Sequence, residues 1–479
     1  MSRLLALLAV LAVHPAIAAD YYAKPAATGS GNCASLENAC SLTKLVSKLK
    51  CGDTGYVADG NYAAVSIDAS ANCVGKATMT LRAMNPQGAV LTGKEPTSQG
   101  APPVIEVFGG NVGNIVIGYF KIVVVADAFG IQLRAVKQRD ITIDHVEIEL
   151  RAKGGTGIWV PSGGVNLVVQ DSYLHKSRPE FAGKNDGSAA FAIDIYDDAH
   201  PSTGLILRRN HIKDWWGGVT IKNSTQVSIT DNVFENIHDH TVKPVDVNGL
   251  DFFRNVWWQS SKYGLYNGDV MATWCSANVR AYNNTAVGGG FSFPVIGTMP
   301  SCDAACGGGP NCAGIKSDGR GPQLRTNQND GLILANNIIS GGDPRLAFCV
   351  QLDAARCSTA DCVYDRANIY FECVTGPGSP DASCPDRAAV KEIAVRWGDS
   401  EECLARWQAR PKGALWTGVS PCAECLSSDP KFVDAAAGNF KLQPSSPARD
   451  SGDDAHCANT VVGAHCDIGA FEWAGSTSP

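Results

Sequence analysis

Charged residues are scarce in this sequence, and basic ones are scarcer than acidic ones. They make up 18% of the 479 residues, and 47 acidic against 40 basic side chains give a formal charge of −7. A nucleic-acid-binding protein needs a basic face, so nucleic acid is not an expected partner. Beyond the N-terminus, no apolar stretch approaches the roughly 20 residues of a membrane-spanning helix, so we expect no membrane span.

The first residues have the pattern of a secretory signal peptide. A basic start at Arg3 precedes the short apolar run of residues 4–13, and Ala16-Ile17-Ala18 provides a small-x-small cleavage site. We therefore expect residues 1–19 to be a signal peptide and the mature chain to be secreted, in the extracellular space or the periplasm.

Cysteine is absent from one long stretch, although the chain holds 18 cysteines. None lies between Cys73 and Cys275. In an exported chain such cysteines predict disulfides, and they would fasten the two ends and leave the middle to other forces. For Cys422 and Cys425 a structural disulfide is favoured over a zinc or redox pair.

The middle of the chain repeats a short phrase in which alternating apolar residues lead to Asn. The intervals between successive phrases are close to one coil of a solenoid, since Asn210 to Asn232 is 22 residues and Asn232 to Asn255 is 23. Such a period, built from short strands, predicts stacked coils. A buried amide needs partners, and Asn side chains stacked ~4.8 Å apart can bond to one another. Later copies hold Asn284 and Asn337.

Residues 100–340 accordingly resemble the right-handed parallel β-helix of pectate lyases, polygalacturonases and many bacterial surface proteins. The expected fold is all-β, a right-handed parallel β-helix with an N-terminal helical cap and a disulfide-rich C-terminal region. Residues 20–99 would form the cap and first coils, with a helix over 41–49 that ends before Gly52.

The end of the chain resembles the closing signature of β-helix proteins of the choice-of-anchor Q type. The matching segments are 429–434, 438–452 and 467–472, with Cys457 and Cys466 as additions in this chain. We assign residues 427–479 to this closing segment. Residues 341–426 break the period and predict a cysteine-rich excursion with one helix, over 388–397.

Strand alternation sends two columns of side chains outward, on strands that each begin with a small residue. One column is Gln132, Trp159, Asp194, Thr220, Lys243 or Pro244, and Tyr266. The other is Arg134, Pro161, Tyr196, Lys222, Asp246 and Asn267. Aromatic rings among charges suit a groove for an extended glycan, whereas the alternative is an ordinary solvated strand face.

The favoured function is a lyase that cleaves uronic-acid polysaccharide by β-elimination. A basic side chain would take the proton beside the carboxylate, and a cation, with Ca²⁺ a candidate cofactor, would neutralise that carboxylate. The candidate catalytic residues are Lys222, Tyr196, Asp194, Asp246, Lys243 and His240. The candidate substrate-binding residues are Trp159, Arg134, Arg178, Trp216 and Tyr266.

Two other functions stay open at this stage. Asp194 and Asp246 would lie two coils apart, nominally ~10 Å, at the outer edge for an inverting glycoside hydrolase of the polygalacturonase type. A non-catalytic glycan-binding or adhesive solenoid is the third possibility, because the same scaffold hosts all three. In each case the expected partner is an extracellular polysaccharide, and the protein is expected to be a monomer.

Overall fold

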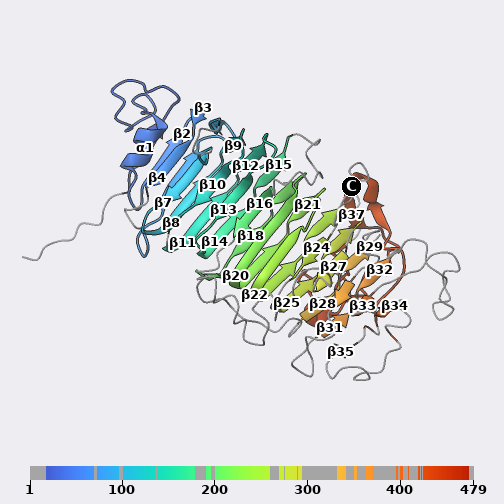
Figure 1. The fold of residues 1–479 in the computed structure, drawn as a ribbon. Helices are drawn as coiled ribbons and strands as arrows, with labels where there is room; N and C mark the ends of the chain where they lie inside the picture. The colour runs from blue at the N-terminus through green and yellow to red at the C-terminus, as the bar shows by residue number, and fades with distance from the viewer. Residues whose placement is uncertain are drawn as a thin grey trace, which may run out of the picture.

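The chain folds into the predicted parallel β-helix (Figure 1). The computed structural model describes residues 18–68, 73–95, 101–135, 137–177, 190–195, 200–258, 269–273, 276–288, 290–293, 332–340, 350–352, 363–371, 395–397, 400–402, 408, 419–420, 422 and 424–473. Each coil places one strand on each of three faces, which we number in chain order. No described helix is long and apolar enough to cross a membrane.

Face 1 holds the strands on which the outward column was predicted. They are β4 (Val65–Asp68), β7 (Ile105–Phe108), β10 (Phe129–Leu133), β13 (Thr156–Val160), β16 (Phe191–Ile195), the first parts of β20 (Gly217–Thr230) and β22 (Val242–Phe253), β24 (Asp269–Ala272), β27 (Gly290–Phe293), β30 (Val350–Leu352) and β33 (Val395–Trp397).

Face 2 follows face 1 in each coil. Its strands are β1 (Asp20–Ala23), β2 (Thr54–Val57), β5 (Met79–Ala83), β8 (Asn111–Gly118), β11 (Lys137–Asp144), β14 (Val165–Gln170), β17 (Ser202–Thr203), β18 (Ile206–Arg208), the later parts of β20 and β22, β25 (Ala277–Tyr282), β28 (Leu332–Ala335), β31 (Val363–Arg366) and β35 (Val419–Ser420).

Face 3 completes the coil with short strands. These are β3 (Gly60–Ala63), β6 (Ala89–Thr92), β9 (Lys121–Val124), β12 (Glu147–Leu150), β15 (Tyr173–Lys176), β19 (His211–Lys213), β21 (Val233–Glu235), β23 (Val256–Trp258), β26 (Thr285–Val287), β29 (Ile338–Ser340) and β32 (Ile369–Phe371).

Apolar side chains of successive coils stack in the interior. On face 1 the inward row is Ile131, Ile158, Ile193, Val219 and Val242, each at most 1% exposed. These inward side chains alternate with the outward column on the same strands, as strand alternation predicts. Burial of each such side chain stabilises the fold by roughly 1.5–3 kcal/mol before the cost of ordering it.

The predicted asparagine ladder forms at the corner between faces 2 and 3. Nδ2 of Asn210 donates to Oδ1 of Asn232 at 3.0 Å, and Asn232 donates to Asn255 at 3.0 Å. The chain continues from Asn255 to Asn284 at 3.2 Å and from Asn284 to Asn337 at 2.9 Å. Each of these amides is at most 2% exposed, so the ladder satisfies polar groups that water cannot reach.

The residue before each ladder position has a left-handed backbone, and acidic and basic side chains alternate at the successive corner positions Asp171, Arg209, Asp231 and Arg254. Arg209 binds Asp171 through two bonds of 2.6 Å, and Arg254 binds Asp231 at 2.6 and 2.7 Å. Bidentate pairs of this kind join neighbouring coils from the outside. The ladder and these ion pairs together hold the corner of the coils that they join.

The N-terminal end carries the predicted helical cap. Helix α1 (Leu42–Lys48) begins at Ser41, whose side chain accepts a hydrogen bond from Lys44 N, and buries Leu42, Leu45 and Val46. Figure 1 shows α1 at the blue end of the solenoid. Disulfides Cys33–Cys40 and Cys51–Cys73 fasten this region.

The closing segment folds back along the last coils. It forms the hairpin of β36 (Phe432–Asp434) and β37 (Asn439–Leu442), and short turns η4 (Ala435–Ala437) and η5 (Asp454–His456). Asn283 Nδ2 donates to Asp467 O at 2.9 Å, and Ala470 N donates to Thr285 Oγ1 at 3.0 Å. The cysteine pairs Cys422–Cys425 and Cys457–Cys466 are disulfides, as predicted for the first of them.

Parallel pairing continues beyond residue 340. Strand β30 pairs with β27, β31 with β28 and β32 with β29, and Asn337 donates to Asn368 at 3.0 Å. Part of the helix predicted over 388–397 is instead strand, because Val395–Trp397 form β33, which pairs with β30 and with β34 (Ser400–Glu402). Residues 388–394 lie outside the described residues, as do residues 1–17 of the predicted signal peptide over residues 1–19.

Candidate functional site

A continuous column of side chains runs outward along face 1. Register pairs place Gln132 beside Trp159, Trp159 beside Asp194, Asp194 beside Thr220 and Thr220 beside Lys243. This is the first predicted column as far as Lys243. Successive members lie one strand spacing apart, ~4.8 Å, so the column can contact consecutive units of an extended polymer.

Two aromatic rings form a platform at one end of this column. The ring centroids of Phe129 and Trp159 are 4.1 Å apart with an interplanar angle of 19°. Trp159 is half-buried, which leaves part of its indole at the surface. Further along the same end, Arg134 Nη2 binds Glu106 Oε1 at 2.6 Å, so the charge of Arg134 is already partnered. A flat, partly exposed ring suits stacking on a sugar face.

Asp194 and Lys243 have pKa values displaced toward neutrality. Burial raises the pKa of Asp194 to about 6, against the opposing influence of Lys243. Burial lowers the pKa of Lys243, and Asp239 and Asp194 partly counter that effect, whereas Lys222 adds to it. Asp194, Lys222 and Asp239 therefore all act on Lys243, and we call these four side chains the cluster. Acid–base chemistry near neutral pH requires such displacements.

Lys222 and Asp246 do not share the column in which the sequence placed them. Lys222 is aligned with Val245, and Asp246 falls in the turn between the pairs Lys222–Val245 and Ser224–Val247. There Asp246 has φ 52°, as Asn223 has φ 51° in the preceding coil. Lys222 acts on Lys243, but the second predicted column is wrong at Asp246. The reason is the register: Val242 pairs with Val219 and Val245 with Lys222, so Asp246 falls opposite Asn223, one residue beyond its predicted partner Lys222. The last member of that column, Asn267, lies outside the described residues.

Residues 238–241 pack against the preceding coil and bring a second carboxylate, that of Asp239, to Lys243. Asp239 N donates to Trp216 O at 2.7 Å, and Gly218 N donates to His240 O at 3.1 Å. A Cβ on Gly218 would lie 2.3 Å from Thr241 O, so only glycine permits this close approach. Rings of Trp216 and His238 have centroids 4.5 Å apart. His240 Nε2 lies 3.9 Å from Asp239 Oδ1. The predicted residues Trp216 and His240 therefore both contact Asp239, which places them beside the cluster.

Three predicted site residues, Tyr196, Arg178 and Tyr266, lie outside the described residues. Two residues that now belong to the site were absent from the predicted set, Phe129 and Asp239. Phe129 stands one position before the small residue Gly130, with which the aligned strand begins. Its stacking partner Trp159 was already among the predicted substrate-binding residues. Asp239 was visible in the turn of 238–240, but its approach to Lys243 depends on the docking of that turn.

The cluster does not suit a calcium ion. Ca²⁺ takes six to eight oxygen ligands, whereas Asp194 and Asp239 lie among Lys222 and Lys243. Among the described residues, groups with metal-ligand spacing lie elsewhere, and two of them contain disulfide cysteines. In the third, which includes Asp144 and His145, Asp171 is bound by Arg209.

No protein-family model and no curated protein matches the chain. Similar solved structures include the pectate lyase Pel9A, with 13% identity, 96% of this chain and 98% of that chain covered, and a TM-score of 0.45. A PL6 family polysaccharide lyase from Pseudopedobacter saltans has 12% identity, 84% and 94% coverage and a TM-score of 0.40. The A-module of the Azotobacter vinelandii mannuronan C-5 epimerase AlgE6 has 12% identity, 79% and 91% coverage and a TM-score of 0.32. This likeness concerns the fold.

Proposed function

We propose that this protein is an exported lyase that cleaves an acidic polysaccharide by β-elimination on face 1. The observation that carries the proposal is the alignment of Asp194 with Lys243, a carboxyl of raised pKa and an amine of lowered pKa, next to an aromatic platform. The disulfides at both ends of the chain support an oxidising compartment.

The residues divide the reaction between them as follows. The Lys222 ammonium faces the uronate carboxylate and favours the negative charge that develops when the adjacent C5–H bond breaks. Lys243, whose neutral form is favoured by burial, accepts that proton. The electron pair forms the C4–C5 double bond, the C4–O bond breaks, and protonated Asp194 gives its proton to the departing oxygen.

Polymer binding is assigned to the platform and the column that follows it. Trp159, stacked on Phe129, would take a sugar unit next to the cleaved bond, one coil from Asp194. No step of this proposal runs through a metal ion, because the Lys222 ammonium provides the positive charge that faces the uronate carboxylate. Calcium nevertheless belongs in the assay, since a polysaccharide can itself carry the ion.

Hydrolysis is the second candidate, favoured by one observation: Asp194 and Asp239 both act on Lys243, so two carboxyl groups flank one position. Asp194 would then protonate the leaving oxygen and Asp239 would activate water. The pair Asp194–Asp246 is not supported, because Asp246 lies in the turn.

The test is the absorbance of the unsaturated uronate while the purified chain meets a panel of uronic-acid polysaccharides, with calcium or with chelator. A rising signal that Lys243→Met and Asp194→Asn abolish supports the lyase. New reducing ends without that absorbance identify a hydrolase and overturn the lyase proposal. Binding without cleavage on any polymer leaves a glycan-binding solenoid and overturns both.

A further inference from the structure

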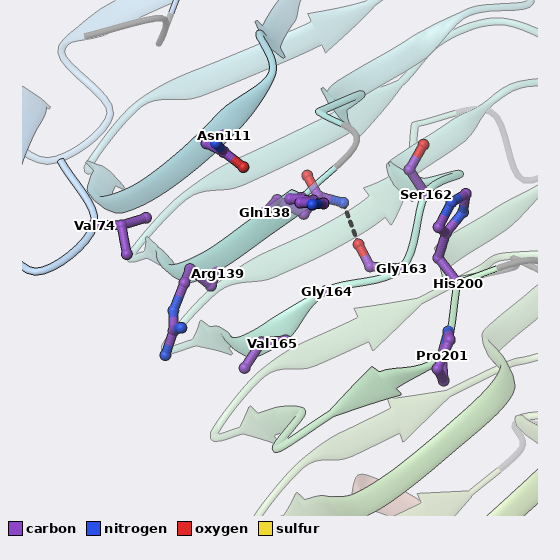
Figure 2. A pocket seen from close by; sticks show the side chains of 11 residues that line it. Val74, Asn111, Gln138, Arg139, Ser162, Gly163, Gly164, Val165, His200 and Pro201 are labelled. Atoms are coloured by element: carbon purple, nitrogen blue, oxygen red, sulfur yellow. Dashed lines mark hydrogen bonds between the residues drawn. The ribbon is translucent and has the colours of Figure 1, made fainter. Parts of the chain in front are cut away.

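A cavity of about 490 Å³ lies where the chain passes from face 1 to face 2 (Figure 2). Its walls come from the starts of β8 and β11, from the turn between β13 and β14, and from the turn before β17. We call it the turn cavity. Ser162, in its wall, stands three residues after Trp159, so the cavity adjoins the strand that carries the aromatic platform.

Gln138 occupies a core position beside this cavity. The corresponding residue of the preceding coil is Val112, which is fully buried, and that of the next coil is Gly164. Gln138 itself is 4% exposed. A Cβ built on Gly164 would meet only Leu167 Cβ at 3.8 Å and Gln138 Cγ at 3.9 Å. The row of Val112, Gln138 and Gly164 thus ends in a residue that leaves room above the glutamine.

The Gln138 amide is only half satisfied. Its Nε2 donates to Gly163 O, as the dashed line in Figure 2 shows, but no donor among the described residues lies within hydrogen-bonding distance of Oε1. A valine, as in the preceding coil, would fill this position without that cost. An amide oxygen kept without a donor at the edge of a cavity indicates that a donor arrives from elsewhere.

The rim of the turn cavity is basic and its inner walls are partly apolar. Lys137 and Arg139 stand on either side of Gln138, and His200 lies across from them. Arg139 Nε also binds Asp140 Oδ2 at 2.8 Å, which offsets one of these charges. Val165 and Pro201 provide apolar surface, which matches the C–H face of a pyranose ring.

We propose that the turn cavity binds one uronate residue, with the Gln138 amide on a ring hydroxyl and Lys137 on the carboxylate. The identity of the ligand rests on the proposed function, because the cavity would take a terminal unit of the same acidic polymer. Gly163 supports the site, since it has φ +64° and a Cβ there would lie 2.4 Å from His200 O.

The experiment titrates the full chain with sodium galacturonate, glucuronate and mannuronate, and with glucose as the neutral sugar, by saturation-transfer difference NMR. We expect at least one uronate to bind and glucose to bind at least tenfold more weakly. Gln138→Val and Lys137→Met should each weaken the uronate by about tenfold. Lys441→Met, an exposed lysine in the closing segment, should bind like the parent.

Two readouts keep the result separate from folding and from catalysis. Gln138→Val should unfold at the same or a higher urea concentration than the parent, because it removes an unsatisfied buried oxygen. Asp194→Asn should bind the uronate unchanged. The cavity proposal is overturned if no uronate binds, or if the parent, Gln138→Val and Lys137→Met bind the uronate equally well. This holds even where polymer is cleaved. Uronate binding that these two variants lose upholds the cavity even where no polymer is cleaved.

Discussion

Asp194 and Lys243 project from the same outward position of face 1, two coils apart, with Thr220 between them. Thr220 is 4% exposed, and its hydroxyl has no hydrogen-bond partner among the described residues. A carboxyl, an unsatisfied hydroxyl and an amine thus follow one another at strand spacing. Such a row is costly for stability, and groups with displaced pKa values of this kind cluster at functional sites.

Asp194→Asn should stabilise the protein above pH 6 while it abolishes activity. The pKa of Asp194 is raised in the folded chain to about 6, from an ordinary value of 3.8, so the folded state holds its proton more tightly than the unfolded state. The free energy of unfolding therefore falls as pH rises from about 4 to about 6, by up to about 3 kcal/mol. Urea unfolding at pH 4 and pH 8 measures this.

The amide variant should match the parent at pH 4 and exceed it at pH 8. A variant that is less stable than the parent at pH 8 would show that the Asp194 carboxylate is held by favourable contacts. The raised pKa would then be wrong, and with it the assignment of Asp194 as the proton donor.

Lys243→Met should reduce kcat by about 10²–10⁴-fold, the usual range for loss of an acid–base group. Lys222→Met should reduce kcat by about 10²–10³-fold, the range for loss of a group that stabilises developing charge. Burial lowers the pKa of Lys243, so methionine should also leave the fold intact or firmer. The matched control is Lys213→Met on face 3, where Lys213 Nζ binds Glu235 at 2.8 Å. Its activity should stay within twofold of the parent; a loss as large as in Lys243→Met would point to a general effect of charge.

Trp159→Ala should raise KM more than it lowers kcat. The variant removes the ring that stacks on Phe129, and loss of one sugar-stacking surface costs about 1–2 kcal/mol, or about 5- to 30-fold in binding. Trp159→Phe should recover most of the affinity. Steady-state kinetics on one polymer measures both; an unchanged KM in Trp159→Ala would remove the platform from the proposed site.

Much of the fold could be predicted because the ladder leaves a period in the sequence. Buried amides need partners, so Asn210, Asn232 and Asn255 recur at coil spacing, and alternation then fixes the column as far as Lys243. The coil at Asn368 could have been found in the same way, from the phrase of residues 364–370. Asn368 follows Asn337 by 31 residues, against 22 and 23 in the regular coils, and the prediction ended the solenoid at residue 340.

The site was harder to predict because it depends on turns. The register of β22 against β20 differs by one residue from the predicted alignment, so Asp246 lies opposite the left-handed Asn223 and outside the column. Asp239 reaches Lys243 only because Gly218 lets residues 238–241 approach. The half-satisfied Gln138 amide depends on Gly164 in the next coil. Period and alternation describe single strands, whereas these contacts arise between turns of different coils.

Asn255→Ala should destabilise the protein by about 3 kcal/mol or more. Asn255 is 1% exposed; its Nδ2 donates to Ile229 O at 2.8 Å, and its Oδ1 accepts from Asn232 N and Asn232 Nδ2, both at 3.0 Å. Alanine leaves those buried groups without partners, at about 1–3 kcal/mol each, with partial relief from relaxation. The exposed Asn85, which binds Asp59 at 3.0 Å, is the control, and Asn85→Ala should change stability by less than about 0.5 kcal/mol. Hydrogen exchange should locate the loss in the coils on either side of Asn255. Equal urea midpoints for the two variants would mean that the ladder aligns the coils without stabilising them.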